Sequence, residues 1–254
     1  MKKIIPFLIA AAFGFTGCGN NDKKTGSPPD SGEKKDSVSA EAPVPAGMSE
    51  VKYDCETDEL FKGTKVASAC WNDRRGKNLV VISQKEQYSW KEENPSMKKY
   101  AESEDDELAA ELFACHFVWD ESTEKWNTYW LLNDFNIGCC DVWIEYEPGT
   151  LEVKDIDGDG DGDPSFFYLI YSGTNGMDFY YNAKLITYSD SLKLKVSGTT
   201  GLGKAMIEEG GLKKETYDAA FKNVDKLFES YAKERWKNCH DQKVSRDEKN
   251  QMPI

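Results

Sequence analysis

The sequence has few of the residues that hydrolytic active sites use. Only two of its 254 residues are histidines, His116 and His240. The Gly-x-Ser-x-Gly and His-Glu-x-x-His patterns of serine hydrolases and zinc proteases are absent. His116 lies inside an apolar, strand-like run with no nucleophile close to it in sequence, which favours a packed histidine over a general base. The motifs therefore assign no catalytic residue.

Positive charge is also scarce. The chain has 45 acidic and 32 basic residues, a net charge of −13. A protein of this charge is poorly suited to bind nucleic acid or anionic lipid directly. Part of the excess lies in residues 102–107, which lack glycine at turn positions. These residues are predicted to form a solvated loop and not a second ion site.

No apolar run is long enough to span a bilayer. The run of residues 4–15 follows Lys2 and Lys3, which is typical of a signal peptide covering residues 1–17. It ends in the residues Phe15-Thr16-Gly17-Cys18, which resemble the lipobox of bacterial lipoproteins. The resemblance implies that Cys18 is acylated, with palmitate as a typical chain, and that the protein is anchored to a membrane. We therefore predict an outer membrane lipoprotein that faces the periplasm or the cell surface.

Aromatic residues are missing from residues 19–47, whose only branched apolar residues are Val38 and Val44. Such a segment cannot bury enough surface to offset its ordering entropy. The lipidated cysteine and a disordered tether are therefore predicted to occupy residues 18–48. A single β-rich domain is predicted over residues 49–240, with a polar tail at 241–254.

The Cys-x-x-Cys spacing of thiolate metal sites is absent. With Cys18 assigned to lipid, six cysteines remain that could form disulfides in an oxidising compartment, although free buried thiols are an alternative. Their pairing stays open, but neighbouring cysteines are expected to bond to different partners because a ring between adjacent residues is strained. The candidates are Cys55, Cys70, Cys115, Cys139, Cys140 and Cys239.

Runs rich in β-branched and aromatic residues dominate the domain and predict strands. Short turn-like segments at residues 72–76 and 120–124 favour hairpins and hence antiparallel pairing. Apolar residues at helical spacing predict one amphipathic helix over residues 217–236, with Asp218 as its cap and a break near residues 223–225. The fold class is therefore α+β, mainly β, with an antiparallel meander sheet covered by a C-terminal amphipathic helix. The predicted strands are residues 65–71, 78–83, 111–119, 125–133, 141–147, 150–154, 165–172, 182–188 and 192–197.

The most informative motif is residues 155–163, where five aspartates stand at alternate positions with glycine in most of the gaps. Calcium takes six to eight oxygen ligands, which a loop supplies from positions 1, 3, 5 and 9 around a turn at position 6. A register starting at Asp155 places Gly160 at the turn. A register starting at Asp157 would place Ser165, a poorer ligand, at position 9, and an acidic turn without any ion is a further alternative. The predicted calcium ligands are Asp155, Asp157, Asp159, Asp161 and Asp163.

The loop differs from an EF-hand beyond position 9. Position 12 is Phe166, where an EF-hand has a bidentate glutamate. The loop also joins two predicted strands, whereas the EF-hand switch reorients two helices. It looks more like the Asp-x-Asp-x-Asp-Gly-x-x-Asp loops of integrin-type propeller repeats. A structural calcium site is therefore predicted.

Several segments together resemble a family of uncharacterised exported bacterial proteins with one Asp-rich, EF-hand-like loop. Some of its members carry a name that links them to surface polysaccharide biosynthesis. The family supplies no catalytic residues to carry over to this chain. The segments that carry the resemblance are residues 65–82, 111–114, 133–135, the Asp-rich loop with residues 167–171, residues 184–186, and residues 231–236.

Two functions of different classes follow. The favoured one is a non-catalytic, lipid-anchored cell-envelope protein with a structural calcium loop, which binds an unknown surface glycan or protein and no nucleic acid. The alternative is an enzyme of surface polysaccharide biosynthesis or modification that uses Glu145 and Glu147, which would share one face of a strand. Trp126, Trp130 and Trp143 are candidates for stacking on sugars, with core packing as the alternative for each.

Overall fold

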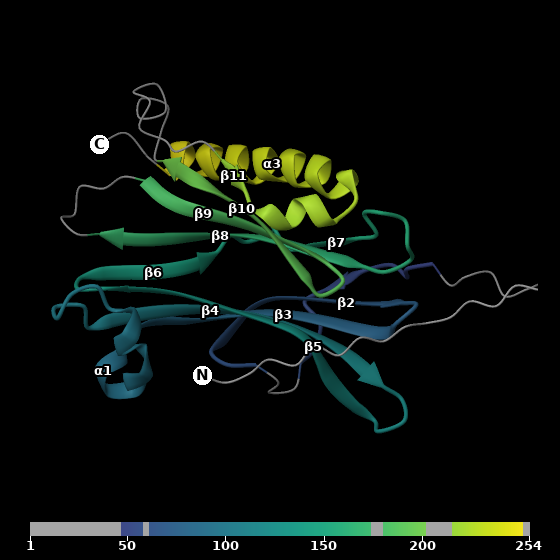
Figure 1. The fold of residues 1–254 in the computed structure, drawn as a ribbon, viewed down its shortest axis with the longest axis horizontal. Coiled ribbons are helices and arrows are strands. Elements are labelled where there is room, and N and C mark those ends of the chain that lie inside the picture. Colours follow the sequence, from purple (N-terminus) through teal and green to yellow (C-terminus); the bar gives the residue numbers. More distant parts are fainter. Residues whose placement is uncertain (1–46, 58–60, 174–179, 202–214, 251–254) are drawn as a thin grey trace, which may run out of the picture. The chain divides into compact units, whose positions relative to one another are not determined.

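The computed structural model describes residues 47–57, 61–173, 180–201 and 215–250. These residues form two antiparallel β-sheets and a long C-terminal helix (Figure 1). The predicted signal peptide, Cys18 and the tether up to residue 46 lie outside the described residues and stay predictions.

Each sheet is built mainly from strands that are neighbours in sequence. The first has the order β1-β2-β3-β4-β5 and the second the order β11-β10-β9-β8-β6, with β7 paired to β8 beside this path. Short helices follow β3 and β11. The first sheet contains β1 (Lys52–Tyr53), β2 (Thr64–Asp73), β3 (Gly76–Ser89), β4 (Leu108–Asp120) and β5 (Lys125–Gly138). The second contains β6 (Asp141–Tyr146), β7 (Glu152–Lys154), β8 (Asp163–Gly173), β9 (Tyr180–Ser189), β10 (Leu192–Gly201) and β11 (Thr216–Tyr217). The helices are α1 (Trp90–Glu93), η1 (Pro95–Tyr100), η2 (Ala219–Asn223) and α3 (Lys226–Asn250).

The predicted fold class is confirmed. Every predicted strand is present, although most are longer than the sequence pattern indicated, and both predicted hairpin turns join antiparallel neighbours. The prediction was a single meander sheet, whereas the strands divide into two sheets. The two-residue strands β1 and β11 are too short to give a sequence signal.

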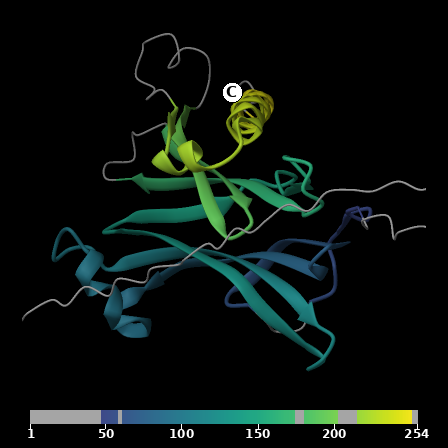
Figure 2. The same ribbon diagram turned by 45° about the vertical axis from the view of Figure 1, so that its right-hand side comes forward.

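Strand β8 shows how the layers are arranged, because both of its faces are buried. Phe166 and Tyr168 point into the core between the two sheets. Phe167 and Leu169, one position along in each case, point into a second core beneath α3. Since side chains alternate along a strand, one strand serves two cores. Figures 1 and 2 show the resulting order of first sheet, second sheet and helix.

The helix packs through a stripe of side chains at helical spacing. Asp218 caps η2 by accepting a hydrogen bond from Ala220 N at 3.1 Å. The chain then breaks and resumes as α3 at Lys226, as predicted. Arg235 ties the helix to the second sheet by donating from Nη2 to the Thr150 carbonyl at 2.8 Å. The residues facing the sheet are Phe228, Ala232, Trp236 and Cys239.

Helix α3 continues to Asn250, ten residues beyond the predicted domain end at residue 240. Its exposed face is strongly charged, and none of the helices in the described ranges is long and apolar enough to cross a membrane.

One disulfide joins Cys55, just after β1, to Cys70 on β2, with their Cα atoms 6.3 Å apart. Such a bond indicates an extracytoplasmic protein, because reducing compartments rarely maintain structural disulfides. Within the described ranges, Cys115 and Cys239 are buried free thiols, and Cys139 and Cys140 are exposed free thiols. The expected bonding of Cys139 and Cys140 to different partners is therefore not seen.

Candidate metal centre

The Asp-rich loop is the connection of a β-hairpin. It joins β7 to β8, whose register pairs Lys154 with Asp163 and Val153 with Pro164. Val153 is buried between the two sheets, and Ile156 at the start of the loop packs against the core under α3. Both ends of the loop are thereby fixed to packed strands, so the carboxylates project from a defined frame.

The first three aspartates form what we call the outer cluster: Asp155, Asp157 and Asp159. One carboxylate oxygen from each lies within 4.8 Å of the others, a spacing that could hold a metal ion. Asp155 shapes the loop by accepting hydrogen bonds from Gly158 N at 2.8 Å and from Gly160 N at 3.0 Å. Gly160 has φ +87°, which an L side chain rarely adopts, and this is the sharp turn expected at position 6.

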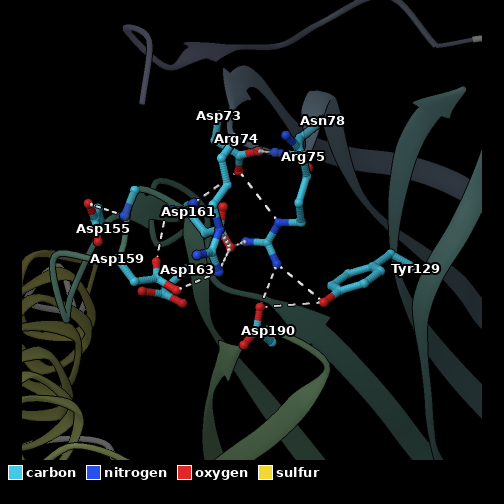
Figure 3. Close-up of polar contacts among 12 residues, drawn as sticks. Asp73, Arg74, Arg75, Asn78, Tyr129, Asp155, Asp159, Asp161, Asp163 and Asp190 are labelled. Carbon is cyan, nitrogen blue, oxygen red and sulfur yellow. Dashed lines mark hydrogen bonds and ion pairs between the residues drawn. The ribbon is translucent and has the colours of Figure 1, made fainter. Parts of the chain in front are cut away.

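The remaining acidic groups of the site meet two arginines at the tip of the β2–β3 hairpin. We call Asp73, Asp161 and Asp190 the inner cluster. Arg75 lies among them, 2.9 Å from Asp190, 3.4 Å from Asp161 and 3.8 Å from Asp73. Figure 3 shows its guanidinium between the loop on one side and Asp190 and Tyr129 on the other. The inner cluster therefore has a cation supplied by the protein itself.

Arg74 spans the two clusters. Its Nε donates to Asp161 Oδ2 at 2.7 Å, and its Nη2 donates to Asp159 Oδ2 at 2.9 Å. Asp159 thus belongs to the outer cluster while sharing one oxygen with this exposed arginine. Any ion held by the outer cluster would share Asp159 with Arg74.

Asp73 anchors the hairpin tip to the loop. Its carboxylate accepts hydrogen bonds from Trp71 Nε1 at 2.8 Å, from Arg75 N at 2.8 Å and from Gly162 N at 3.1 Å. Burial alone would raise the pKa of Asp73, but these hydrogen bonds outweigh it and lower the pKa. Gly162 must be glycine, because an added Cβ would lie 2.5 Å from Trp71 Nε1.

The aspartates on the loop side are held under electrostatic stress. Burial, with a smaller contribution from Asp157 and Asp159, raises the pKa of Asp163 to about 8. Desolvation within the loop raises the pKa of Asp157 as well, although its side chain is exposed, and the neighbouring charge of Asp159 adds to it. Carboxylates in this condition favour either a proton or a bound cation.

The structure places the five predicted ligands in three different settings. Asp155, Asp157 and Asp159 converge on one another, whereas the side chain of Asp161 turns to the arginines. In a loop of this type position 7 contributes its backbone carbonyl, so Asp161 is free to pair elsewhere. Asp163 lies at the start of β8, where its Oδ2 accepts a hydrogen bond from Ile156 N at 3.0 Å. The glycine turn and this convergence both fit the register that starts at Asp155.

The predicted site residues did not include Asp73, Arg74 and Arg75 at the β2–β3 tip, or Asp190 in the β9–β10 turn. The hairpin tip was identified as a turn, but its two adjacent arginines are 85 to 87 positions away from their partners on the loop. Two neighbouring cations in so acidic a chain are the one local signal that could have drawn attention to this tip.

The other candidate residues do not form a site. His116 is a packed core residue, 1% exposed, with its Nε2 2.9 Å from Asn78 Oδ1. Glu145 is exposed on β6, whereas Glu147 lies beyond the end of that strand and is buried, so the two do not share an open face.

The three tryptophans also differ in their surroundings. Trp130 is stacked on Tyr188 inside the core, with ring centroids 3.7 Å apart. Trp126 packs edge-on against Trp119, and Trp143 packs against two tyrosines of the second sheet.

Comparison of the chain with protein-family models, with curated proteins and with solved structures found no match. What can be stated of its function therefore depends on the Asp-rich site and the disulfide. The resemblance to exported bacterial proteins stays a prediction.

Proposed function

We propose that this protein is a non-catalytic, lipid-anchored protein of the bacterial cell envelope whose Asp-rich loop binds calcium as a structural staple. The observation that carries the proposal is the convergence of Asp155, Asp157 and Asp159 within 4.8 Å of one another around the Gly160 turn. Oxygen ligands on a flexible turn suit calcium better than metals that favour nitrogen or sulfur.

Charge supports an ion at the outer cluster. The two arginines lie against the inner cluster and reach the outer cluster only through Asp159. Asp155 and Asp157 form no ion pair with any described residue, and their carboxylates repel one another until a cation neutralises them. Calcium would thereby hold the β7–β8 connection in one conformation, next to the contacts that Arg74 of the β2–β3 tip makes with Asp159 and Asp161.

Three observations support the cellular setting. The Cys55–Cys70 disulfide indicates an oxidising compartment. The signal-like run and Cys18 in the sequence favour lipid anchoring, and extracellular calcium sites of this kind are weak, with dissociation constants of about 10⁻⁴ to 10⁻³ M. Environmental calcium would then keep the site filled, and the domain would present its surface to a glycan or protein partner.

Thermal unfolding of the full chain in calcium and in chelator tests the proposal. Calcium at ten times its dissociation constant should stabilise the protein by about 1.4 kcal/mol. For a domain of this size that corresponds to a rise in midpoint of roughly 3–5 °C. Magnesium should give a smaller rise, because it demands a near-ideal octahedral shell and dehydrates reluctantly.

Asp157→Asn should abolish the calcium-dependent rise, because it removes one carboxylate of the outer cluster. Asp105→Asn is the matched control, since it makes the same change of charge in an exposed segment outside the site and should keep the full rise. Equal midpoints in calcium and chelator, or an undiminished rise in Asp157→Asn, would defeat the proposal.

A further inference from the structure

Cys139 and Cys140 form a second cluster of reactive groups, separate from the Asp-rich site. They are the two residues between the end of β5 at Gly138 and the start of β6 at Asp141. Since β5 belongs to the first sheet and β6 to the second, this dipeptide is the covalent crossover from one sheet to the other. Both cysteines are exposed, and their Sγ atoms lie 2.8 Å apart.

Neither thiol has another cysteine near enough to bond with. Cys115 on β4 lies opposite Leu131 on β5. Leu131 is eight positions before Cys139, which corresponds to about 26 Å along an extended chain, so Cys115 is too far from Cys139 to bond with it. Cys239 is 1% exposed in the core beneath α3. Cys55 and Cys70 are bonded to each other. Within the described part of the chain, each of the two thiols therefore has only the other as a partner.

The short separation favours a covalent bond over a shared metal. Two thiolates on one tetrahedral zinc, each about 2.3 Å from the ion, lie well over 3 Å apart. A disulfide needs about 2.05 Å, so these sulfurs need to approach by less than 1 Å.

We propose that Cys139 and Cys140 are a thiol–disulfide exchange site, which closes reversibly into a vicinal disulfide by reaction with a low-molecular-weight disulfide. The thiolate of Cys139 attacks one sulfur of the small disulfide R–S–S–R, whose S–S bond breaks and releases one thiolate. Cys140 then attacks the mixed disulfide through its own thiolate, displaces the second small thiolate and forms the Cys139–Cys140 bond. Two cysteine thiols lose two electrons and two protons, and one R–S–S–R becomes two R–SH.

The order of attack follows from the contact between the two sulfurs. A hydrogen bond with Cys139 raises the pKa of Cys140, with smaller contributions from desolvation and from the charges of Cys139 and Asp141. Cys140 therefore keeps its proton and stabilises the Cys139 thiolate during the first step.

The vicinal bond is expected to be more labile than the Cys55–Cys70 bond. Disulfides usually join Cα atoms 4.4–6.8 Å apart, and the 6.3 Å of Cys55 and Cys70 lies in that range. Consecutive Cα atoms are about 3.8 Å apart, so a ring between them is strained and is reduced more easily. Strained and exposed disulfides are the ones that exchange.

The surroundings of Cys139 select among small disulfides. Cys139 lines a cavity of about 630 Å³ together with Glu102 and Asp106, and Asp141 directly follows Cys140 in sequence. Negative charge on this rim favours a cationic disulfide such as cystamine over the anionic oxidised glutathione. The preference should be largest at low ionic strength and should shrink as salt screens the rim.

The test treats the reduced, folded full chain with cystamine or with oxidised glutathione, then alkylates it and maps the peptides by mass spectrometry. The wild-type peptide containing both residues should lose two alkylatable thiols and retain no small thiol. Cys139→Ser and Cys140→Ser should each stop at one bound small thiol, because no second cysteine resolves the mixed disulfide. Cystamine should react about threefold faster than oxidised glutathione at low salt.

Buried Cys115 and Cys239 are internal controls that should stay unmodified while the protein is folded. In a titration with increasing dithiol, the Cys139–Cys140 bond should open while Cys55–Cys70 stays closed. Two free thiols after cystamine treatment, a stable adduct on the wild type, or a bond to Cys18 or to another chain would each overturn the proposal. The outcome does not depend on calcium, so it can fail or succeed independently of the proposed function.

Discussion

The two halves of the Asp-rich site contain the same kind of side chain but balance its charge differently. In the inner cluster, Arg75 lies within 4 Å of Asp73, Asp161 and Asp190. In the outer cluster, Asp155 and Asp157 converge with Asp159, and among the described residues Asp159 is the one member of this cluster that contacts an arginine, Arg74. The inner half thus contains its own cation, whereas the outer half is arranged to take one from solution.

Burial explains the difference. The side chains of Asp73 and Asp161 are almost fully buried, so leaving either without a cation would cost several kcal/mol. Asp157 and Asp159 are exposed, and water compensates for their charge when no ion is bound. A permanent arginine is therefore needed where solvent is excluded, and an exchangeable ion suffices at the surface.

Removing Arg75 should have the largest effect on this arrangement. Arg75→Ala leaves buried Asp73 without its cation and leaves buried Asp161 with Arg74 alone. It should therefore lower the free energy of unfolding by about 3 kcal/mol in either calcium or chelator. Urea unfolding followed by tryptophan fluorescence measures this.

Lys77→Ala is the control for Arg75→Ala. Lys77 lies on the same hairpin, but its ion pair with Glu121 is exposed on both sides, so its loss should cost under about 1 kcal/mol. Similar losses in the two variants would show that the inner cluster is no more dependent on its arginine than a surface pair is.

Acid should weaken the inner half through His116, which lies behind Arg75 and Tyr129. Burial, with a smaller contribution from the charge of Arg75, lowers the pKa of His116 to about 3. Asn78 donates from Nδ2 to the Gly76 carbonyl, so Asn78 Oδ1 is the atom that accepts a hydrogen bond from His116 Nε2. Nε2 of His116 therefore already carries a proton, and acid would have to add the second proton at Nδ1. Nδ1 is buried and has no hydrogen-bond partner among the described residues.

The direction of the pH effect follows from this lowered pKa. Below about pH 6.5 His116 takes up a proton in the unfolded chain but not in the folded protein. The contribution of His116 to the free energy of unfolding is therefore fully present above that pH and declines towards pH 3. Within this range His116 lowers the free energy of unfolding by up to about 1.4 kcal/mol for each pH unit of acidification. Urea unfolding between pH 4 and 7 should show a shallower decline in His116→Gln, and the wild-type decline in the control His240→Gln. Equal slopes in all three proteins would contradict the assignment to His116.

The parts of this fold that sequence could predict are those encoded locally. Residues 155–163 carry their own turn glycine and carboxylates, and Asp218 caps the turn that immediately follows it. Residues 166–170 also carry a local sequence signal, for the number of layers in the fold. They are apolar or aromatic without alternation, which is typical of a strand buried on both faces and so predicts three layers.

The contacts that could not be predicted join residues far apart in the chain. Arg74 and Asp161 are 87 positions apart, and no periodicity or motif connects a hairpin tip in one sheet to a loop in the other. Likewise, six cysteines allow fifteen complete pairings, and only the packing of β1 against β2 brings Cys55 to Cys70.

Arg74 offers the finest test of how the two halves differ, because among the described residues it is the exposed cation that contacts both of them, through Asp159 and Asp161. Its side chain is 55% exposed and holds one oxygen of Asp159, an oxygen that a bound calcium ion would also attract. Arg74→Gln removes this competing charge, so calcium should bind about threefold more tightly, and the gain should shrink with added salt. Calorimetric titration with calcium measures it, and Lys77→Gln on the same hairpin should leave affinity nearly unchanged. Weaker binding by Arg74→Gln would instead mean that the arginine positions Asp159 for the ion, and that the outer cluster depends on the inner one.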